Sequence, residues 1–330
     1  MKKNRARCRV DCLILIAETD DDGRRLDRVL RKALSDMPLS AIHRQLRKGE
    51  IKINGKKTSP SYLVKKGDEI AVNAGHEIRK EKETKRNSTF KLDILYEGEG
   101  ILAVNKPVGI NVHGKNSLDD SVRSYLEQKL SPSLSFKPGP LHRLDRGSSG
   151  VIVFSSSLEG AREFSRLLRE KKIMKYYLAV VLGEIKKEDI WEDDLSRREK
   201  PETARIAITR VKPLAAAGGC TLVLAEIETG RTHQIRAQAA FHGYPLLGDS
   251  QYGAKPGNKI SRKTNSLQES NESFHLHALR LEIPKEILSK NGTPNNEKLI
   301  VEAPLPESFR KKILEIFGKI SCNQAFPIVI

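Results

Sequence analysis

One nine-residue segment constrains this chain more than any other. It reads His-Arg-Leu-Asp-Arg-Gly-Ser-Ser-Gly at positions 142–150, and it leads directly into the apolar run Val151–Phe154. The pattern predicts a polar turn at the start of a buried strand, with Asp145 held between Arg143 and Arg146. An Asp fixed on a loop beside a sheet is positioned to act as a nucleophile or a general base. The same residues also fit a plain ion-paired turn, and this segment alone leaves both interpretations open.

Two further segments narrow the choice. Residues 175–183 read Lys-Tyr-Tyr-Leu-Ala-Val-Val-Leu-Gly, and residues 230–236 read Gly-Arg-Thr-His-Gln-Ile-Arg. Together with the first segment, in this order and at these separations, they resemble the RluA family of pseudouridine synthases, which isomerise uridine in RNA. That family's signature is His-Arg-Leu-Asp-x-x-Thr/Ser-Ser/Ala-Gly, then Lys-x-Tyr, then Gly-Arg-x-His-Gln-Ile-Arg. Gly147 and Ser148 depart slightly from the usual residues, and the resemblance covers roughly residues 18 to 318.

The resemblance implies a role for several side chains. Asp145 matches the family's catalytic carboxylate, and Arg143 is expected to fill the space that the target uridine leaves when it flips out of the RNA. Tyr177, the Tyr of Lys-x-Tyr, is expected to pack against the target base, with Tyr176 at the variable position. Ile235 is expected to help close the pocket. Without the resemblance, Tyr177 would be read as an ordinary core residue of a buried strand.

Arg236 is the expected partner of Asp145. The sequence predicts a strand over residues 221–228, followed by a helix that Thr232 caps and that closes near Gly243. Arg236 falls in the first turns of that helix, where its fork-shaped guanidinium could hold Asp145 bidentately and keep it ionised. The family resemblance implies the same pairing. The alternative for Arg236 is an exposed helix arginine.

The chemistry implied by the resemblance needs only one carboxylate. Breaking the glycosidic bond, turning the base and rejoining it through carbon 5 involves no redox step and no phosphoryl transfer, so we expect no cofactor. The carboxylate adds to the sugar, adds to the pyrimidine or takes a ribose proton, and the sequence leaves these routes open. We expect His142 and His233 to support the pocket by hydrogen bonds, with silent histidines as the alternative. Because no His spacing typical of metal sites occurs, we expect no metal.

A strongly positive charge predicts a polyanionic partner. The chain has 59 Lys and Arg against 42 Asp and Glu, a net charge of +17 and a pI near 9.7. Residues 1–90 hold 23 basic and 13 acidic residues, whereas the other 240 residues hold 36 and 29. Scattered surface lysines would also raise the pI, but they explain this asymmetry poorly. We therefore expect the N-terminal part to contact RNA.

Residues 18–78 are expected to form a compact basic domain. The pattern predicts helices over residues 23–34 and 40–47, a strand over residues 50–53, and an Asn-Gly hairpin turn at residues 54–55. This order resembles the S-four-type (α-L) RNA-binding domain. The basic residues that we expect to face RNA phosphates are Arg24, Arg25, Arg28, Arg44, Arg47, Lys48, Lys52, Lys56 and Lys57. The alternative is the solvated face of an ordinary helical hairpin.

The remaining chain suggests an α+β architecture. Around the basic domain we expect an N-terminal strand and extension (residues 1–17), a charged linker (79–89), a catalytic domain (90–320) and a C-terminal tail (321–330). The catalytic domain should contain a central, mainly antiparallel mixed sheet, as the resemblance implies. Lys106-Pro-Val-Gly109 looks like the family's first motif. The polar residues 255–273 suggest a mobile surface insertion before a strand over residues 276–281.

Several features bear on location and partners. No run approaches the roughly 20 apolar residues that span a bilayer, and the apolar run at residues 12–17 is too short for a typical signal peptide. The four cysteines do not form a disulfide framework. We therefore expect a cytoplasmic monomer with no membrane contact.

The identity of the RNA is less constrained. Residues 42–57 look most like the RluC-type members that act on large-subunit ribosomal RNA, so 23S rRNA or a large-subunit precursor is the expected substrate, with tRNA as the alternative. A non-catalytic RNA-binding or ribosome-assembly factor would explain the charge equally well. It would not explain why Asp145, Tyr177 and Arg236 are all intact. A hydrolase using Asp145 would normally need a second carboxylate, which the motifs lack.

Overall fold

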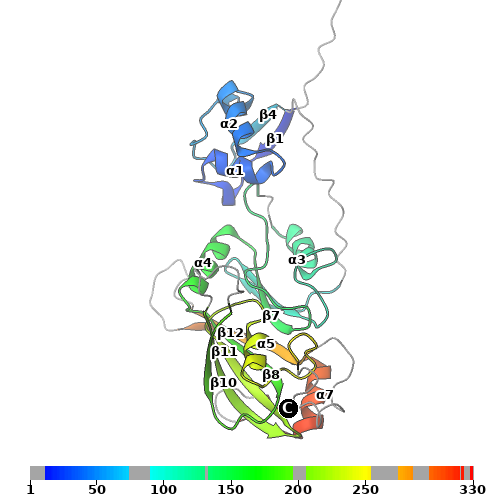
Figure 1. Cartoon of the computed structure of the whole chain (residues 1–330). Helices are drawn as coiled ribbons and strands as arrows, with labels where there is room; N and C mark the ends of the chain where they lie inside the picture. Colours follow the sequence, from blue (N-terminus) through cyan, green and yellow to red (C-terminus); the bar gives the residue numbers. More distant parts are fainter. Residues whose placement is uncertain are drawn as a thin grey trace, which may run out of the picture. The chain divides into compact units, whose positions relative to one another are not determined.

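The computed structural model describes residues 12–73, 90–130, 133–195, 206–253, 274–284, 297–319, 321–322 and 328–329. The chain divides into two compact units (Figure 1). The first comprises Met1–Ser88, Arg123–Pro138 and Ser157–Glu159, and the second comprises Thr89–Val122, Gly139–Ser156 and Gly160–Ile330. The predicted linker at residues 79–89 and the predicted insertion at residues 255–273 lie outside the described residues.

The described part of the first unit pairs two helices with a small sheet. Its elements are β1 (Cys12–Ile16), the 3-10 turn η1 (Thr19–Asp21), α1 (Leu26–Ala33), α2 (Leu39–Lys48), β2 (Ile51–Ile53), β3 (Lys56–Lys57) and β4 (Glu69–Asn73). The sheet is antiparallel with the order β1-β4-β2-β3. One apolar core joins Leu30 of α1, Ile42 of α2 and Ile51 of β2, all fully buried. Burial of these side chains is what holds two such short helices in place.

The local predictions for this unit are confirmed, with one shift. Asn54 and Gly55 have φ angles of 49° and 75°, which the predicted two-residue hairpin turn requires. The first helix begins at Leu26 instead of residue 23. Gly23 has φ 67° and Arg25 is extended, so neither residue continues a right-handed helix.

A segment distant in sequence completes the first unit. Asp21 has no exposed surface, and its carboxylate accepts hydrogen bonds from the backbone N–H groups of Leu134 (3.1 Å) and Ser135 (2.9 Å). The Ser135 hydroxyl also donates to Asp21, and Leu134 packs against the core of this unit. A buried carboxylate requires such donors because burial removes its hydration. Residues 134–135 are therefore part of the folded N-terminal unit.

The described part of the second unit forms a nine-stranded mixed sheet. Its strands are β5 (Ile94–Gly98), β6 (Ile101–Lys106), β7 (Ser149–Ser155), β8 (Met174–Leu182), β9 (Asp189–Asp194), β10 (Ile206–Ala217), β11 (Cys220–Ile227), β12 (Leu276–Pro284) and β13 (Lys298–Glu302). The order is β5-β6-β7-β12-β8-β11-β10-β9, with β13 paired to β12. Only β7 and β12 run parallel among these pairs. The predicted α+β fold with a mainly antiparallel sheet is confirmed.

Three helices lie against this sheet, namely α4 (Leu158–Arg169), α5 (Gln234–Phe241) and α7 (Glu307–Phe317). A further helix, α3 (Leu118–Glu127), is divided between the two units. Phe164 of α4 packs with residues of β6, β7 and β12, whereas Phe309 and Ile313 of α7 pack with β8 and β11. Near the C-terminus, β14 (Ser321–Cys322) pairs with β15 (Ile328–Val329).

Three strands of the nine-stranded sheet were not predicted from the sequence. These are β9, β10 and β13, which contain charged residues and, in β10, a proline. The pairing of β10 with β11 shifts register between Pro213 and Ala215, because proline has no N–H to contribute to a sheet. The strands predicted around the motifs are present, since their apolar runs are continuous and end at polar turns.

The parallel pair β7 and β12 positions the first motif. Their contact is short, with Ser149 opposite His277 and Gly150 opposite Ala278. Gly150 has φ 106°, and a Cβ at this position would lie 2.1 Å from the Ala278 carbonyl oxygen. Only glycine permits this backbone approach. The polar turn carrying Asp145 therefore ends in a glycine that the sheet requires.

Candidate active site

The turn that carries Asp145 is tied down by a buried lysine. Lys106, at the end of β6, has no exposed surface, and its Nζ donates to the carbonyl oxygens of Pro107 (2.9 Å), Arg146 (3.2 Å) and Ser148 (2.6 Å). Burial lowers the pKa of Lys106 to about 8, and the charge of Asp145 acts in the opposite direction. The segment beginning at Lys106 and the Asp145 turn thus form one hydrogen-bonded structure.

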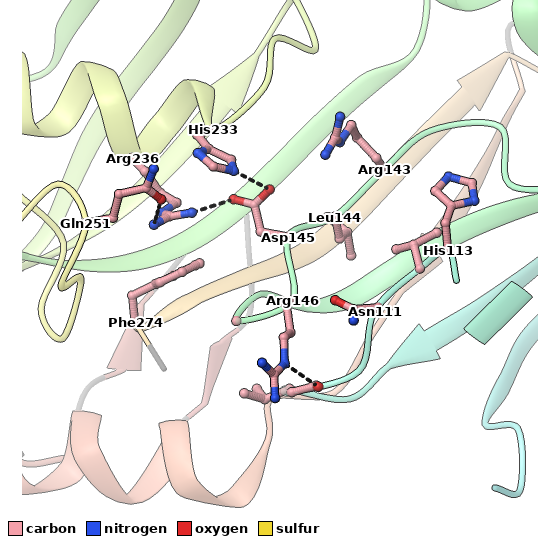
Figure 2. A pocket seen from close by; sticks show the side chains of 14 residues that line it. Asn111, His113, Arg143, Leu144, Asp145, Arg146, His233, Arg236, Gln251 and Phe274 are labelled. Carbon is pink, nitrogen blue, oxygen red and sulfur yellow. Dashed lines mark hydrogen bonds and ion pairs between the residues drawn. The ribbon is translucent and has the colours of Figure 1, made fainter. Parts of the chain in front are cut away.

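The two carboxylate oxygens of Asp145 face different side chains from one segment. Oδ2 accepts a hydrogen bond from Nη1 of Arg236 at 3.2 Å, and Nε2 of His233 lies 3.6 Å from Oδ1 (Figure 2). The side chains of Asp145 and Arg236 are 14% and 7% exposed. The structure therefore brings three sequence-predicted residues together in a nearly buried ion-paired group.

The predicted bidentate grip of Arg236 on Asp145 is wrong. The guanidinium directs Nε and Nη2 to Asp249, at 2.6 Å and 2.9 Å, and only Nη1 reaches Asp145. Nη2 also donates to the side-chain oxygen of Gln251 at 3.1 Å, and the face of the Phe274 ring lies 4.2 Å from the guanidinium carbon. The sequence predicted correctly that Arg236 lies beside Asp145. The packing around Arg236 determines which carboxylate accepts two of its hydrogen bonds.

Two buried glutamines anchor helix α5 to the backbone of strand β10. Gln234 Nε2 donates to the Ile208 carbonyl oxygen at 3.0 Å, and Gln238 Nε2 donates to the Ala207 carbonyl oxygen at 3.1 Å. The residue at the start of the helix is His233 instead of Thr232, with φ 54°. This left-handed conformation is uncommon for a non-glycine residue and is sustained only by the surrounding contacts.

A cavity of about 760 Å³ opens beside Asp145. Of the sequence-predicted residues, Arg143, Asp145, His233 and Arg236 line it. It is also lined by side chains that the sequence reasoning did not single out, among them Asn111, His113, Gln251 and Phe274 (Figure 2). The cavity is of the size that small-molecule sites commonly have. Four of the seven predicted active-site residues thus face one open space.

Tyr177 and Ile235 are not among the residues that line the cavity. Both are buried, at 8% and 5% exposure. Burial raises the pKa of the Tyr177 phenol, and the negative charge of Asp145 raises it further. The ring therefore stays protonated at neutral pH and lies within electrostatic reach of Asp145. Tyr176, the next residue on β8, is opposite Glu226.

His142 also lies outside the cavity lining. Its Nε2 accepts a hydrogen bond from the Val153 N–H at 3.0 Å, and its ring stacks near Phe164. Burial, aided by the charge of Lys175, lowers the pKa of His142 to about 3. A neutral imidazole that accepts a backbone hydrogen bond orients the turn against β7, so its position suits a structural role.

The nine basic residues predicted to face RNA all lie in the first unit. Arg28, Arg44, Arg47, Lys48, Lys52, Lys56 and Lys57 are exposed. Arg24 is half-buried and donates to the Ser135 carbonyl oxygen at 3.3 Å, and Arg25 pairs with Asp27 at 2.7 Å. Arg24 is therefore partly withdrawn from solvent, whereas Arg25 stays exposed although it pairs with Asp27.

Asp249 and Lys106 are the main site residues that sequence reasoning missed. Asp249 follows the buried apolar pair Leu246 and Leu247 after one glycine, and such a placement was the available signal for a buried acid. Lys106 was noted only as part of a motif. Neither residue type has a spacing rule that identifies its partner, because their contacts are with residues distant in the fold.

Neither a metal centre nor a membrane span accompanies this site in the described residues. No group of three or more His, Cys, Asp or Glu side chains that could hold a metal ion occurs within the ranges that the structure describes. In the same part of the chain, no helix combines the length and the apolar character needed to cross a membrane.

Known proteins match this chain over most of its length. The RNA pseudouridylate synthase family model matches residues 100–241, and the S4 domain model matches residues 24–70. Proteins named ribosomal large subunit pseudouridine synthase C are 32% identical in Pasteurella multocida and 31% identical in Escherichia coli K12. These matches cover 90% of this chain, and 92% and 94% of the respective relatives.

Two solved human structures share the fold. They are RNA Pseudouridylate Synthase Domain Containing 4 and Domain Containing 1, with TM-scores of 0.54 and 0.50 and 23% identity each. They cover 68% and 66% of this chain, and 93% and 86% of their own chains are matched. The length and identity of the sequence matches go further than the fold alone. The chain therefore belongs to the RluA-type RNA pseudouridine synthases that carry an N-terminal S4 domain.

Proposed function

We propose that this enzyme isomerises uridine in large-subunit ribosomal RNA, with Asp145 as the catalytic residue. The observation that carries the proposal is the Asp145 carboxylate at the cavity wall, with one oxygen on Arg236 and the other 3.6 Å from His233. A uridine stacked within RNA cannot reach a carboxylate that is only 14% exposed. The target nucleotide therefore has to flip into the cavity.

The reaction conserves atoms. The bond between N1 of the base and C1′ of the ribose breaks, the base turns, and a bond forms between C5 and C1′. The C5 proton then leaves and N1 gains a proton, so nothing is oxidised or reduced overall. Asp145 either adds to C1′, adds to the pyrimidine or removes a ribose proton, and each route needs it ionised. The Arg236 hydrogen bond places a positive charge beside this carboxylate.

The surrounding residues have supporting roles in this proposal. Arg143 lines the cavity and would occupy the space in the RNA from which the uridine flips. The buried Tyr177 would pack against the base once it enters, and the buried Ile235 would help close the pocket. His233 would hold the second oxygen of Asp145. We expect no cofactor, because the bond changes require none.

The choice of RNA rests on the relatives and on charge. The two bacterial relatives described above are named as ribosomal large subunit enzymes, and they match 90% of this chain. The exposed lysines and arginines of the first unit would contact phosphates of a large folded RNA, with affinity that depends on salt. Transfer RNA is the alternative substrate.

The first prediction concerns Asp145→Asn in purified protein. The substitution preserves size but removes the charge, so we expect isomerisation of ribosomal RNA to fall by about three orders of magnitude or more. RNA affinity should stay within about twofold, because the carboxylate serves chemistry and not phosphate binding. Pseudouridine formation and RNA binding are measured on the same preparation. Turnover near that of the wild type would disprove the catalytic role.

Mapping pseudouridines in cells tests the substrate. Ribosomal and transfer RNA are compared among cells with the gene intact, deleted or carrying Asp145→Asn. Loss of defined marks from large-subunit RNA in both altered strains would support the proposal. Loss confined to transfer RNA would show that transfer RNA, and not ribosomal RNA, is the substrate. Persistence of every mark would favour a non-catalytic RNA-binding factor.

A further inference from the structure

The carboxylate most tightly bound to Arg236 belongs to none of the three motifs. The Asp249 side chain has no exposed surface. Its Oδ2 accepts a hydrogen bond from Arg236 Nε at 2.6 Å, and its Oδ1 accepts one from Nη2 at 2.9 Å. The backbone N–H groups of Gln251 and Tyr252 also donate to Oδ1, each at 3.0 Å. Four donors thus converge on one buried carboxylate.

Asp249 carries a negative charge in this setting. Burial by itself would raise the pKa of the Asp249 carboxyl, but the Arg236 hydrogen bonds and charge, with the backbone N–H groups, hold the pKa below its ordinary value. The turn that presents it is tight, since a Cβ at Gly253 would lie 2.1 Å from the Asp249 carbonyl oxygen. An ionised carboxylate on a constrained turn therefore holds the guanidinium in one position.

Asp249 and its neighbours set the orientation of Arg236. Besides Asp249, the side-chain oxygen of Gln251 accepts from Nη2 at 3.1 Å, and the rings of Phe274 and Tyr252 lie 4.2 Å and 5.0 Å from the guanidinium carbon. A planar guanidinium held by two short hydrogen bonds and by aromatic rings has little freedom to turn. Only Nη1 is left for Asp145.

Because Arg236 directs two nitrogens to Asp249 and one to Asp145, the two oxygens of Asp145 are bound differently. A bidentate pair would engage both oxygens of Asp145 in strong, charge-assisted hydrogen bonds. In the structure Oδ2 has one such bond, and among the described residues the contact recorded for Oδ1 is the more distant Nε2 of His233, at 3.6 Å. The other titratable groups that sense the charge of Asp145 are Lys106 and Tyr177. One oxygen thus keeps a lone pair for substrate, as a nucleophile or base requires.

We propose that Asp249 is a positioning residue for the isomerisation. It binds Nε and Nη2 of Arg236, so that one oxygen of Asp145 stays open to the uridine. This inference rests on the proposed catalytic role of Asp145. Asp249 does not touch the substrate. It acts on the reaction by fixing the orientation of the Arg236 guanidinium.

The test compares two buried carboxylates that contact helix α5. Asp249→Asn removes the charge while its remaining oxygen still accepts the backbone N–H groups. Asp193→Asn is the matched control, because Asp193 is 11% exposed and contacts Gln238 and His242 without touching Arg236. Asp145→Asn is included in the same assays. Purified variants are compared by steady-state kinetics on ribosomal RNA and by NMR of isotope-labelled arginine side chains.

We expect Asp249→Asn to lower kcat by about 10- to 100-fold, because a misdirected guanidinium covers the open oxygen and small misplacements are costly. KM should change less than about twofold, since Asp249 does not touch the RNA. The Nε–H signal of Arg236, assigned by its disappearance in Arg236→Lys, should move in Asp249→Asn and stay in place in Asp193→Asn. Asp193→Asn should retain kcat.

Other outcomes would contradict either the positioning role of Asp249 or the catalytic role of Asp145. Wild-type kcat in Asp249→Asn, or an equal loss in both variants, would reject the positioning role. If Asp249→Asn does not fold, the wild-type protein still decides: an Arg236 Nε–H that exchanges with water as fast as those of exposed arginines would reject the role. An active Asp145→Asn would reject the proposed catalytic residue, whatever Asp249 does.

Discussion

Two histidines, the half-buried His142 and the fully buried His277, show how single residues of the second unit respond to their surroundings. His142 accepts the Val153 N–H, and His277 lies between the Ser149 hydroxyl (2.8 Å) and the Ala303 carbonyl oxygen (3.1 Å). Burial lowers the pKa of His142 to about 3 and that of His277 to about 4. Both contacts are made by the neutral ring, so the folded state resists protonation at either site.

This difference in proton affinity predicts an acid-dependent stability. The folded pKa of His142 lies below the ordinary value of 6.5, so between about pH 6.5 and pH 3 the unfolded chain binds a proton that the folded chain does not. The stability contributed by the neutral ring is therefore complete above pH 6.5 and is lost as the pH falls toward 3.

We expect His142→Gln to flatten the decline of unfolding free energy with falling pH, by up to about 1.4 kcal/mol per pH unit. The measurement is urea denaturation at several pH values between about 4.5 and 6, followed by the fluorescence of Trp191, the only tryptophan of the chain. Titrating carboxylates cancel in the comparison with the wild type. Parallel curves for the two proteins would contradict the expectation.

At the scale of elements, the junction of β7 and β12 is the most demanding contact near the site. The strands meet in parallel at Gly150, where the backbone has φ 106° and approaches the Ala278 carbonyl oxygen closely. Asp145 lies five residues before this junction in the same turn. The shape of the turn therefore depends on a strand that is more than 120 residues away along the chain.

Gly150→Ala should destabilise the second unit by about 3–5 kcal/mol, because the added Cβ meets backbone atoms and the residue is held at a positive φ. Gly139→Ala is the matched control, since a Cβ there meets nothing within 4 Å. Chemical denaturation monitored by Trp191 fluorescence compares the two. Similar stabilities for both variants would mean that the strands separate at little cost.

At the scale of the whole molecule, the two units differ in charge and in chemistry. The first unit carries the nine basic residues predicted to face RNA, and the second carries Asp145 and its cavity. Asp21 of the first unit binds the backbone of residues 134–135, so a deletion of the N-terminal residues would leave that segment without its partner. Point substitutions therefore test RNA binding more cleanly than truncation does.

Replacing Lys52, Lys56 and Lys57 by Gln should weaken RNA binding and reduce its dependence on salt. Removing one phosphate contact lowers the slope of log affinity against log salt by about 0.7–0.9, so the slope of the triple variant should fall by about 2–3. The control is the replacement of three exposed lysines of the second unit, Lys186, Lys187 and Lys212, which changes the net charge equally. Binding is titrated at several salt concentrations, and equal slopes for the two variants would place the RNA elsewhere.

Short-range patterns in the sequence were enough for the local structure and for the class of enzyme. The Asn54–Gly55 turn, the amphipathic helices of the first unit and the apolar strands beside the motifs each depend on neighbouring residues. The motifs also placed Asp145 and Arg236 at one site, because a family of enzymes with the same chemistry keeps these residues at similar separations.

The partners of the buried charges were decided only by the tertiary structure. Asp249 takes the fork of Arg236, Lys106 binds carbonyl oxygens about 40 residues away, and Asp21 binds residues more than 110 positions further along the chain. A charged side chain in a sequence has many potential partners. The path of the backbone selects one of them, because a buried charge is tolerated only where donors and acceptors converge on it.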